Sequence, residues 1–265
     1  MASNLKFAKE LITFLGKSVI ALLETMIFTF IPRPRKNVAG EIVLITGAGR
    51  GLGRLLALRF AHLGSVLVLW DINKEGNEET CRMAREAGAT RVYAYTCDCS
   101  QKEEIYRVAE QTYKCFLPAM IANDHGHLVC ISSSAGLVGV NKLADYCASK
   151  FAAYGFAESV FTETIVQKLT GIKTTIVCPF FINTGMFEGC STVRPFLLPI
   201  LEPEYVAEKI VDAILKEKVY LYVPRFLYFS MVLKSILPVK IALLLCDFMG
   251  IFNIMDGFVF KNKKH

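Results

Sequence analysis

A glycine-rich turn between an apolar strand and a helix is the feature that most constrains the fold of this chain. Residues 42–46 read IVLIT, a β-branched run typical of a buried parallel strand. The strand runs into the turn TGAGRGLG (residues 46–53), and residues 52–62 have helical periodicity. Glycines there let the backbone approach a pyrophosphate, whose charge faces the free N–H groups of the helix N-terminus. The turn therefore predicts a dinucleotide site that includes Gly47, Gly49, Arg50, Gly51, Leu52 and Gly53.

An acidic residue ends the next predicted strand, which covers residues 66–70. Asp71 stands 71 − 47 = 24 positions after the first glycine of the turn. A carboxylate there accepts hydrogen bonds from an adenosine ribose and repels a 2′-phosphate, which favours NAD. Arg50 could pair with that phosphate, so NADP stays open. Asp98 follows a third strand over residues 91–96 and has two equal interpretations, a contact to the adenine amine or a helix N-cap.

Strands and helices alternate through the middle of the chain. This alternation predicts an α/β fold with a doubly wound parallel sheet, in which ligands bind at the carboxyl ends of the strands. The length of 265 residues suffices for one such domain with a substantial core. Further strands are expected over residues 128–132, 174–178 and 219–223, and further helices over 75–86, 101–120, 145–167 and 204–216.

A second motif places a tyrosine and a lysine on one helix. Tyr146 and Lys150 are four residues apart in YCASK, so they share one helical face. A nearby ammonium lowers the pKa of a phenol from its reference of about 10, which allows Tyr146 to accept and return a substrate proton. Ser133 lies 146 − 133 = 13 residues earlier, at a strand end, and can orient a substrate alcohol or carbonyl. Lys150 can also hold the ribose hydroxyls of a nicotinamide nucleotide.

The apolar residues concentrate at the two ends. They make up 53% of the chain, and the mean hydropathy of +0.40 is high for a freely soluble protein. Residues 11–31 match the ~20 residues of a membrane-spanning helix, and the basic stretch PRPRK follows in place of a signal-peptide cleavage site. We expect a membrane anchor and linker over residues 1–36, with an interfacial helix as the alternative.

The segment over residues 224–265 is also apolar, and two interpretations of it are open. It is either a helix that covers the core or a membrane-associated or substrate-capping segment. The net charge of +6 without a long basic tract favours a membrane over nucleic acid as partner. Nine cysteines indicate a reducing compartment, so the catalytic portion is expected to face the cytosol. No metal site is expected, because Cys97 and Cys99 lack a second pair at zinc spacing.

These motifs resemble the short-chain dehydrogenase/reductase family, and in particular its membrane-bound retinol and 17β-hydroxysteroid dehydrogenase branch. The resemblance rests on the turn, Asp71, Asp98, Ser133 and YCASK, and on segments such as VLWDIN. It implies a Rossmann-like domain over residues 37–223 that oxidises a lipophilic alcohol with NAD. The favoured reaction is all-trans-retinol to retinal, and a hydroxysteroid is the alternative substrate.

The resemblance also implies a location and further contacts. Pro179 and Thr184 are expected at the nicotinamide, although Phe180 replaces the glycine that usually follows the proline. The endoplasmic reticulum membrane, lipid droplets and a homodimer are further expectations. Apolar side chains at Phe180, Phe181, Met186 and Phe187 suit a retinoid and a steroid alike.

One part of the family pattern is missing. The family has an N-N-A-G strand, and a helix with a further catalytic asparagine, before the serine strand, but this chain has no N-N dipeptide. From Arg91 to Leu128 there are 128 − 91 = 37 residues, room for one strand–helix unit of ~30 residues. We expect a shortened form that lacks a central strand and helix, with its junction near Gln111 and Thr112.

Two outcomes follow for the sheet. Either the strand over residues 128–132 moves into the vacant position, a shift of ~4.8 Å, or the sheet has a gap and the fold is unstable. Since a misplacement of ~1 Å can cost ~10²-fold in rate, we expect weak or absent dehydrogenase activity. A catalytically inactive, membrane-bound nucleotide or lipid binder is the alternative function.

Overall fold

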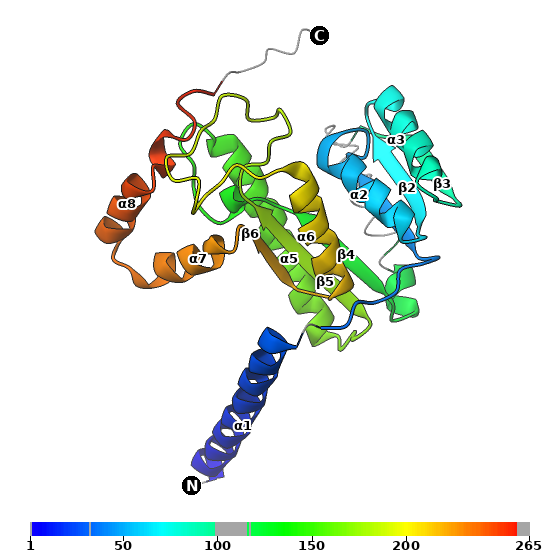
Figure 1. Ribbon diagram of the computed structural model, residues 1–265. Coiled ribbons are helices and arrows are strands. Elements are labelled where there is room, and N and C mark those ends of the chain that lie inside the picture. Colours follow the sequence, from blue (N-terminus) through cyan, green and yellow to red (C-terminus); the bar gives the residue numbers. More distant parts are fainter. Residues whose placement is uncertain (1, 32, 99–115, 117, 259–265) are drawn as a thin grey trace. The chain divides into compact units, whose positions relative to one another are not determined.

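The computed structural model describes residues 2–31, 33–98, 116 and 118–258 (Figure 1). It divides into two compact units, Met1–Lys36 and Asn37–His265. The N-terminal unit contains α1 (Ala2–Phe30), which ends before Pro32 and Pro34, residues that cannot continue a helix. Within α1, Leu5–Phe28 is long and apolar enough to cross a bilayer, with a mean hydropathy of 1.8 over its most apolar stretch. The apolar helix therefore starts earlier than the expected residue 11.

The main unit begins with a parallel sheet of three strands in the order β1-β2-β3. The pairs Thr46–Trp70 and Asp71–Thr96 bring the carboxyl ends of these strands to one edge. The glycine-rich turn and Asp71 both lie at that edge. The elements of this half are β1 (Ile42–Thr46), α2 (Gly51–His62), β2 (Val66–Asp71), α3 (Lys74–Glu86) and β3 (Val92–Thr96).

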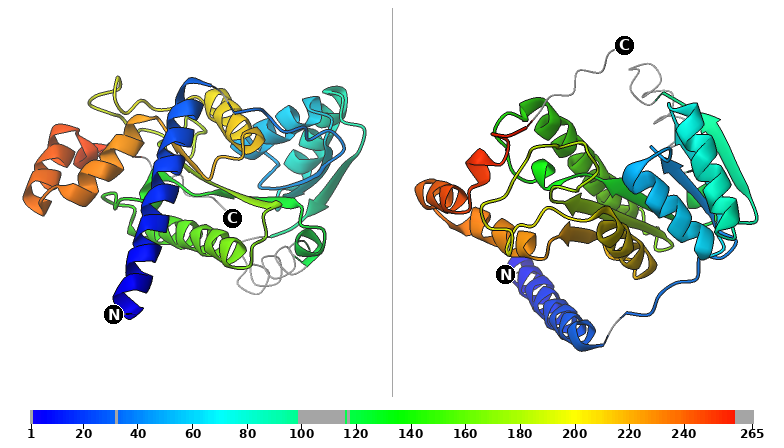
Figure 2. Two further views of the ribbon diagram at one scale, coloured as in Figure 1. Left: turned by 90° about the horizontal axis from the view of Figure 1, so that it is seen from below. Right: turned by 45° about the horizontal axis from the view of Figure 1, so that its top comes forward.

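A second parallel sheet of three strands has the order β4-β5-β6. Two helices, α5 and α6, lie on opposite faces of this sheet (Figure 2). The expected helix over residues 101–120 lies mostly outside the described residues, and residues 118–122 are helical. The elements are β4 (Gly126–Ile131), the 3-10 turn η1 (Ser134–Gly136), α5 (Ala144–Val166), β5 (Ile172–Pro179), α6 (Pro203–Leu215) and β6 (Tyr220–Val223).

Among the described residues the two sheets are not joined, which is the second of the two expected outcomes, a gap in the sheet. The prediction of an α/β fold with parallel strands and a missing central strand is confirmed, but among the described residues β1 and β4 share no strand pairing. The first outcome, a shift of the serine strand into the vacant position, is therefore wrong. The consequence is visible on β1, which was expected to be buried. Its Ile42 is 67% exposed and only Ile45 is buried.

Helix packing connects the two halves in place of strand pairing. One continuous cluster of buried side chains includes Ala57 and Phe60 of α2 and Val206 and Ile210 of α6. Arg59 of α2 donates to the Glu204 carbonyl at 2.9 Å. Directly before the first residues of β1 and β4, His125 Nε2 lies 3.1 Å from both carboxylate oxygens of Glu41. Side-chain packing thus holds β1 and β4 in one unit, although the described residues show no backbone hydrogen bonds between these two strands.

Two apolar helices follow the second sheet. They are α7 (Phe226–Ile236) and α8 (Val239–Phe248), with the 3-10 turn η2 (Ile251–Asn253) after them. Beyond η2 the chain returns to the core, where Ile254 and Met255 are buried. Next to these buried residues, the exposed side chains of Lys142 and Asp256 form an ion pair with 2.9 Å between the Lys142 nitrogen and an Asp256 oxygen.

Candidate active site

The glycine-rich turn has a backbone that side chains would not permit. Gly47 and Gly51 have φ angles of +67° and +54°, in the left-handed region that favours glycine. A Cβ on Gly53 would lie 2.1 Å from the carbonyl oxygen of Gly47. Arg50 occupies the N-cap position of α2 without a side-chain capping bond. The first N–H groups of the helix are therefore directed at a compact backbone cradle of the kind that binds phosphate.

Asp71 lies at the end of β2 and is tied to this turn. One carboxylate oxygen accepts from the Gly49 N–H and the other from the Asn73 N–H, both at 2.8 Å. A Cβ on Gly49 would lie 2.9 Å from the Asp71 carboxylate, so only glycine permits the approach. Each oxygen retains a further lone pair for a ribose hydroxyl. The cradle and the carboxylate fit a dinucleotide.

Sequence reasoning missed the role of Arg54 in this half. Its guanidinium donates to the carbonyl oxygen of Gly49, to that of Gly76 at 3.2 Å and to Thr80 Oγ1 at 2.9 Å. These bonds connect the turn to α3. The signal in the sequence was an arginine one turn into a helix that otherwise buries small and apolar side chains.

Ser133, Tyr146 and Lys150 lie together at the end of β4. Ser133 lies close enough to the Tyr146 phenol to lower its pKa, and its hydroxyl donates to the Pro179 carbonyl oxygen at 3.5 Å. The Lys150 ammonium donates to the Ile131 carbonyl oxygen at 3.2 Å and lies 5.6 Å from the centre of the Tyr146 ring. The structure thus brings the three expected catalytic residues to one place.

The pKa of Tyr146 moves in the opposite direction from the one expected. Burial raises it above the ordinary value, and the hydrogen bond from Ser133 offsets only part of that rise. Burial also lowers the pKa of Lys150. Desolvation therefore outweighs the attraction between ammonium and phenolate that the i, i+4 spacing suggested.

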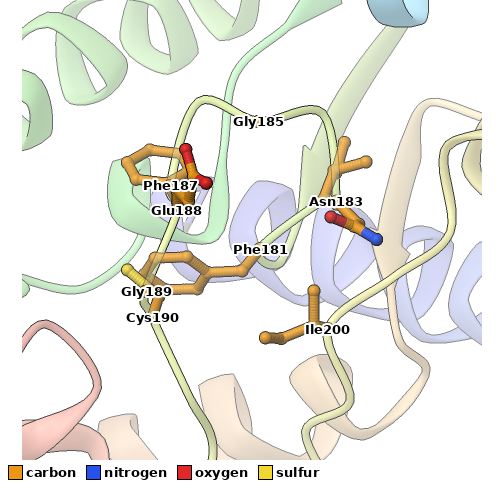
Figure 3. A pocket seen from close by; sticks show the side chains of 9 residues that line it. Phe181, Asn183, Gly185, Phe187, Glu188, Gly189, Cys190 and Ile200 are labelled. Carbon is orange, nitrogen blue, oxygen red and sulfur yellow. The ribbon is translucent and has the colours of Figure 1, made fainter. Parts of the chain in front are cut away.

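The loop after β5 encloses a cavity of about 310 Å³ (Figure 3). Phe187 lines it and packs edge-on against the Tyr146 ring, with 5.5 Å between ring centres. Phe181 also lines it, whereas Phe180 is buried in the core and Met186 is exposed. Sequence reasoning did not foresee Asn183, Glu188, Cys190 and Ile200 in the wall. All of these residues belong to the loop between β5 and α6 (residues 180–202, the cavity loop).

The expected site residues form two groups. The turn, Asp71 and Asp98, which is half-buried two residues after β3, belong to the first sheet. Ser133, Tyr146, Lys150, Pro179 and Thr184 belong to the second. The groups meet at Thr184, whose side chain would lie 3.8 Å from a Cβ on Gly51. A dinucleotide that extends from the turn past Thr184 would reach the Tyr146 group.

Comparisons with known proteins identify the family of the chain. The sequence profile of the family described as short chain dehydrogenase matches residues 41–116 and 110–192, more than half of the chain. Human epidermal retinol dehydrogenase 2 is 66% identical over 308 residues, with all of both chains covered. Human estradiol 17-beta-dehydrogenase 11 is 39% identical, with 88% of this chain and 91% of the relative covered.

A solved structure has the same fold. It is a short chain dehydrogenase/reductase from Burkholderia phymatum in complex with NAD, with a TM-score of 0.63. The sequences are 20% identical, and the match covers 79% of this chain and 96% of the other.

The comparisons also bear on the missing segment. The alignment with epidermal retinol dehydrogenase 2 has 308 positions for the 265 residues of this chain, which leaves 308 − 265 = 43 positions that the relative alone fills. The family profile matches in two pieces that meet at residues 110–116, where the junction was expected.

Proposed function

This chain belongs to the short-chain dehydrogenase/reductase family, and from that premise we propose that it interconverts a lipophilic alcohol and its carbonyl with NAD. The favoured substrate pair is all-trans-retinol and retinal, because epidermal retinol dehydrogenase 2 is a relative at 66% identity. A hydroxysteroid is the second candidate, supported by the 39% identity to estradiol 17-beta-dehydrogenase 11. The observation that carries the proposal is the placement of Ser133, Tyr146 and Lys150 together at the end of β4, with Phe187 in contact both with the Tyr146 ring and with a cavity.

In the oxidation direction, the Tyr146 oxygen takes the hydroxyl proton of the alcohol as the C=O bond forms. Ser133 donates a hydrogen bond to the substrate oxygen and keeps it near the phenol. The Lys150 ammonium, 5.6 Å from the centre of the Tyr146 ring, would attract the phenolate that this step requires and so oppose the effect of burial, which favours the neutral phenol. Bound NAD supplies the acceptor for the hydride that leaves the carbinol carbon. In the reduction direction Tyr146 returns the proton.

The first sheet would hold the adenosine half of the nucleotide. Gly47, Gly49, Gly51 and Gly53 provide the cradle, and Asp71 accepts from the ribose hydroxyls. Arg50 and Leu52 lie at the start of α2, and Asp98 is assigned to the adenine. Lys150, Pro179 and Thr184 are assigned to the nicotinamide half. The Asp71 carboxylate favours NAD over NADP, because it repels a 2′-phosphate.

We propose that this activity is weak. Strand pairing normally fixes the distance between the nucleotide turn and the serine strand, and here β1 and β4 belong to separate sheets. Their alignment rests on side-chain contacts such as those between α2 and α6. A displacement of ~1 Å between the nucleotide and Tyr146 would cost ~10²-fold in rate. The same gap supports the second function, a membrane-bound protein that binds nucleotide or lipid without turnover.

The helix α1 fits a membrane-associated chain. We further assign the protein to the endoplasmic reticulum membrane or lipid droplets, with the main unit in the cytosol. The free cysteines of the described residues support a reducing surrounding. A homodimer is a further prediction. Sedimentation in detergent, which measures the mass of the protein particle, tests it.

The decisive experiment compares this chain with a version into which the 43 additional positions of human epidermal retinol dehydrogenase 2 are inserted at residues 111–112. Membranes that contain each chain receive retinol and NAD, and retinal is measured. We expect a gain of ~10²-fold or more on insertion. Tyr146→Phe in the inserted chain should remove that gain.

Two results would contradict the proposal. Equal, Tyr146-dependent turnover by both chains would refute the reduced activity. Absence of turnover in the inserted chain with retinol, while a hydroxysteroid is oxidised, would refute the favoured substrate. Thermal stabilisation by NAD without turnover of any alcohol would support the inactive binder.

A further inference from the structure

The C-terminal helix pair, α7 and α8, exposes a broad apolar surface. On α7, Phe229, Val232 and Ile236 are 56%, 58% and 69% exposed and stand at i, i+3 and i+7, so they form one stripe. On α8, Ile241 and Leu244 are 49% and 69% exposed and stand at i, i+3. Exposed apolar side chains gathered on a short segment in this way usually mark an interaction site.

Each of the two helices packs one side against the core, through Phe226, Leu227 and Met231 on α7 and Leu245 on α8, and leaves its other side exposed. In α7 only Leu227 is buried, and in α8 no residue is buried. Both helices are described along their whole length, so the exposure belongs to the complete pair. The pair therefore covers part of the core with one side and presents a second, exposed apolar side.

Basic side chains accompany the apolar surface. From Arg225 to Phe248 the pair carries Arg225, Lys234 and Lys240 against the single acidic residue Asp247. Lys234 donates to the Leu137 carbonyl oxygen, so its stem holds α7 against the loop after η1. Lys240 is exposed at the start of α8. Lys240 suits a lipid headgroup layer, because its stem can lie along the apolar part while its charge reaches the phosphates.

We propose that α7 and α8 lie on a lipid bilayer, with their apolar side chains inserted at the level of the headgroups and upper acyl chains. A bilayer accepts a surface that extends over two consecutive helices without a shape-matched partner. The apolar helix α1, which is long enough to cross a membrane, would keep this surface at a high effective concentration of lipid.

The contact also determines what lies next to the bilayer. The Arg194 guanidinium of the cavity loop donates to the Phe248 carbonyl oxygen at 2.8 Å and lies 3.9 Å from the centre of the Phe248 ring. The helix pair is thus attached to the loop that lines the cavity. Insertion of α8 would hold that loop at the membrane surface.

The test uses the full chain in phosphatidylcholine–phosphatidylserine nanodiscs and quenching by brominated lipids. The chain has one tryptophan, Trp70 in β2, which gives the baseline in the unmodified protein. Leu244→Trp adds a fluorophore on the apolar surface. We expect brominated lipids to quench the fluorescence of the tryptophan at position 244. The quenching should be strongest with bromine near the headgroups, because α7 and α8 lie on the bilayer surface.

Two matched variants complete the experiment. Phe14→Trp in α1 should be quenched most by bromine deep in the acyl chains, and Tyr93→Trp, on a strand of the other sheet, should match the baseline. Quenching at Phe14→Trp without quenching at Leu244→Trp would overturn the inference. A blue-shifted but unquenched emission of Leu244→Trp would also overturn it, because protein would then cover the surface. Absence of quenching at both Phe14→Trp and Leu244→Trp would contradict both membrane assignments. None of these readouts depends on enzymatic activity.

Discussion

Asp71 shows how one side chain can have a structural and a binding role together. Its two oxygens accept from Gly49 and Asn73, which positions the turn and the start of α3. The same carboxylate is the group assigned to the ribose. Because both roles act through acceptor lone pairs, removal of the side chain should affect nucleotide choice as well as the turn.

We expect Asp71→Ala to weaken NAD binding by about 10- to 100-fold, the equivalent of one or two charge-assisted hydrogen bonds. Binding of NADP should fall less or increase, because the repulsion of its 2′-phosphate disappears. Titration with both nucleotides measures the ratio. An equal loss for NAD and NADP would mean that Asp71 only supports the turn. Asp247→Ala, an exposed change on α8, is the control.

Two glycines give a matched pair of predictions about backbone space. Gly53→Ala would place a Cβ 2.1 Å from the Gly47 carbonyl oxygen, so the turn must open. Gly155 lies inside α5, and a Cβ added there would meet open space out to 4 Å. Gly155→Ala should therefore stabilise the protein by about 0.5–1 kcal/mol. Thermal melts with and without NAD check both. Retained nucleotide stabilisation in Gly53→Ala would contradict the assigned cradle.

At the scale of elements, α5, β6 and α7 meet in a cluster of tyrosines. The Tyr220 phenol donates to Glu158 at 2.9 Å, and the Tyr154 and Tyr222 oxygens are 3.4 Å apart. The Tyr228 phenol donates to the Tyr220 carbonyl oxygen at 2.9 Å. Burial raises the pKa of each of these four tyrosines, and it raises that of Tyr220 to about 12. The neutral phenols therefore help hold α7 to the sheet.

This cluster predicts a loss of stability at alkaline pH. A tyrosine in the unfolded chain ionises near pH 10, whereas Tyr220 in the folded protein has a pKa of about 12 and keeps its proton until then. The folded state binds more protons in that window, so stability falls as pH rises through it. Tyr220→Phe should reduce the fall in melting temperature between these pH values. Tyr93→Phe on β3 is the control, and an identical slope in both variants would reject the cluster as the cause.

For the whole molecule, the consequence of the shortened chain is that two sheets replace one. β1 and β4 each become edge strands, while β2 and β5 are the central strands of their sheets. Unpaired edges leave backbone N–H groups to water or to side chains. The unit therefore depends on helix packing for the alignment of its nucleotide turn with Tyr146.

Hydrogen exchange should reveal these edges. We expect amides of β1 and β4 to exchange faster than those of β2 and β5, because local opening is easiest where a strand has one neighbour. Insertion of the 43 missing positions should slow exchange in β1 and β4 and leave β3, an edge in both forms, unchanged. Strong protection of β1 in the short chain would show that another segment pairs with it.

The local part of this structure could be predicted from the sequence. The glycine-rich turn, the strand that ends in Asp71 and the helix with Tyr146 and Lys150 depend on residues within a few positions of each other, and periodicity reports such neighbours directly. The length between Arg91 and Leu128 also predicted a missing unit. Which of two outcomes the sheet adopts was beyond sequence reasoning.

The sequence by itself determined the family and the alternation of strands and helices, and it supplied the residues to which the chemistry is assigned. Only the tertiary structure decided that, among the described residues, β1 and β4 do not pair with each other. It also decided that burial raises the pKa of Tyr146 and that much of the apolar surface of α8 stays exposed. The physical reason is common to all three. Strand pairing, desolvation and exposure depend on which distant segments come together, and the pattern within a segment does not contain that information.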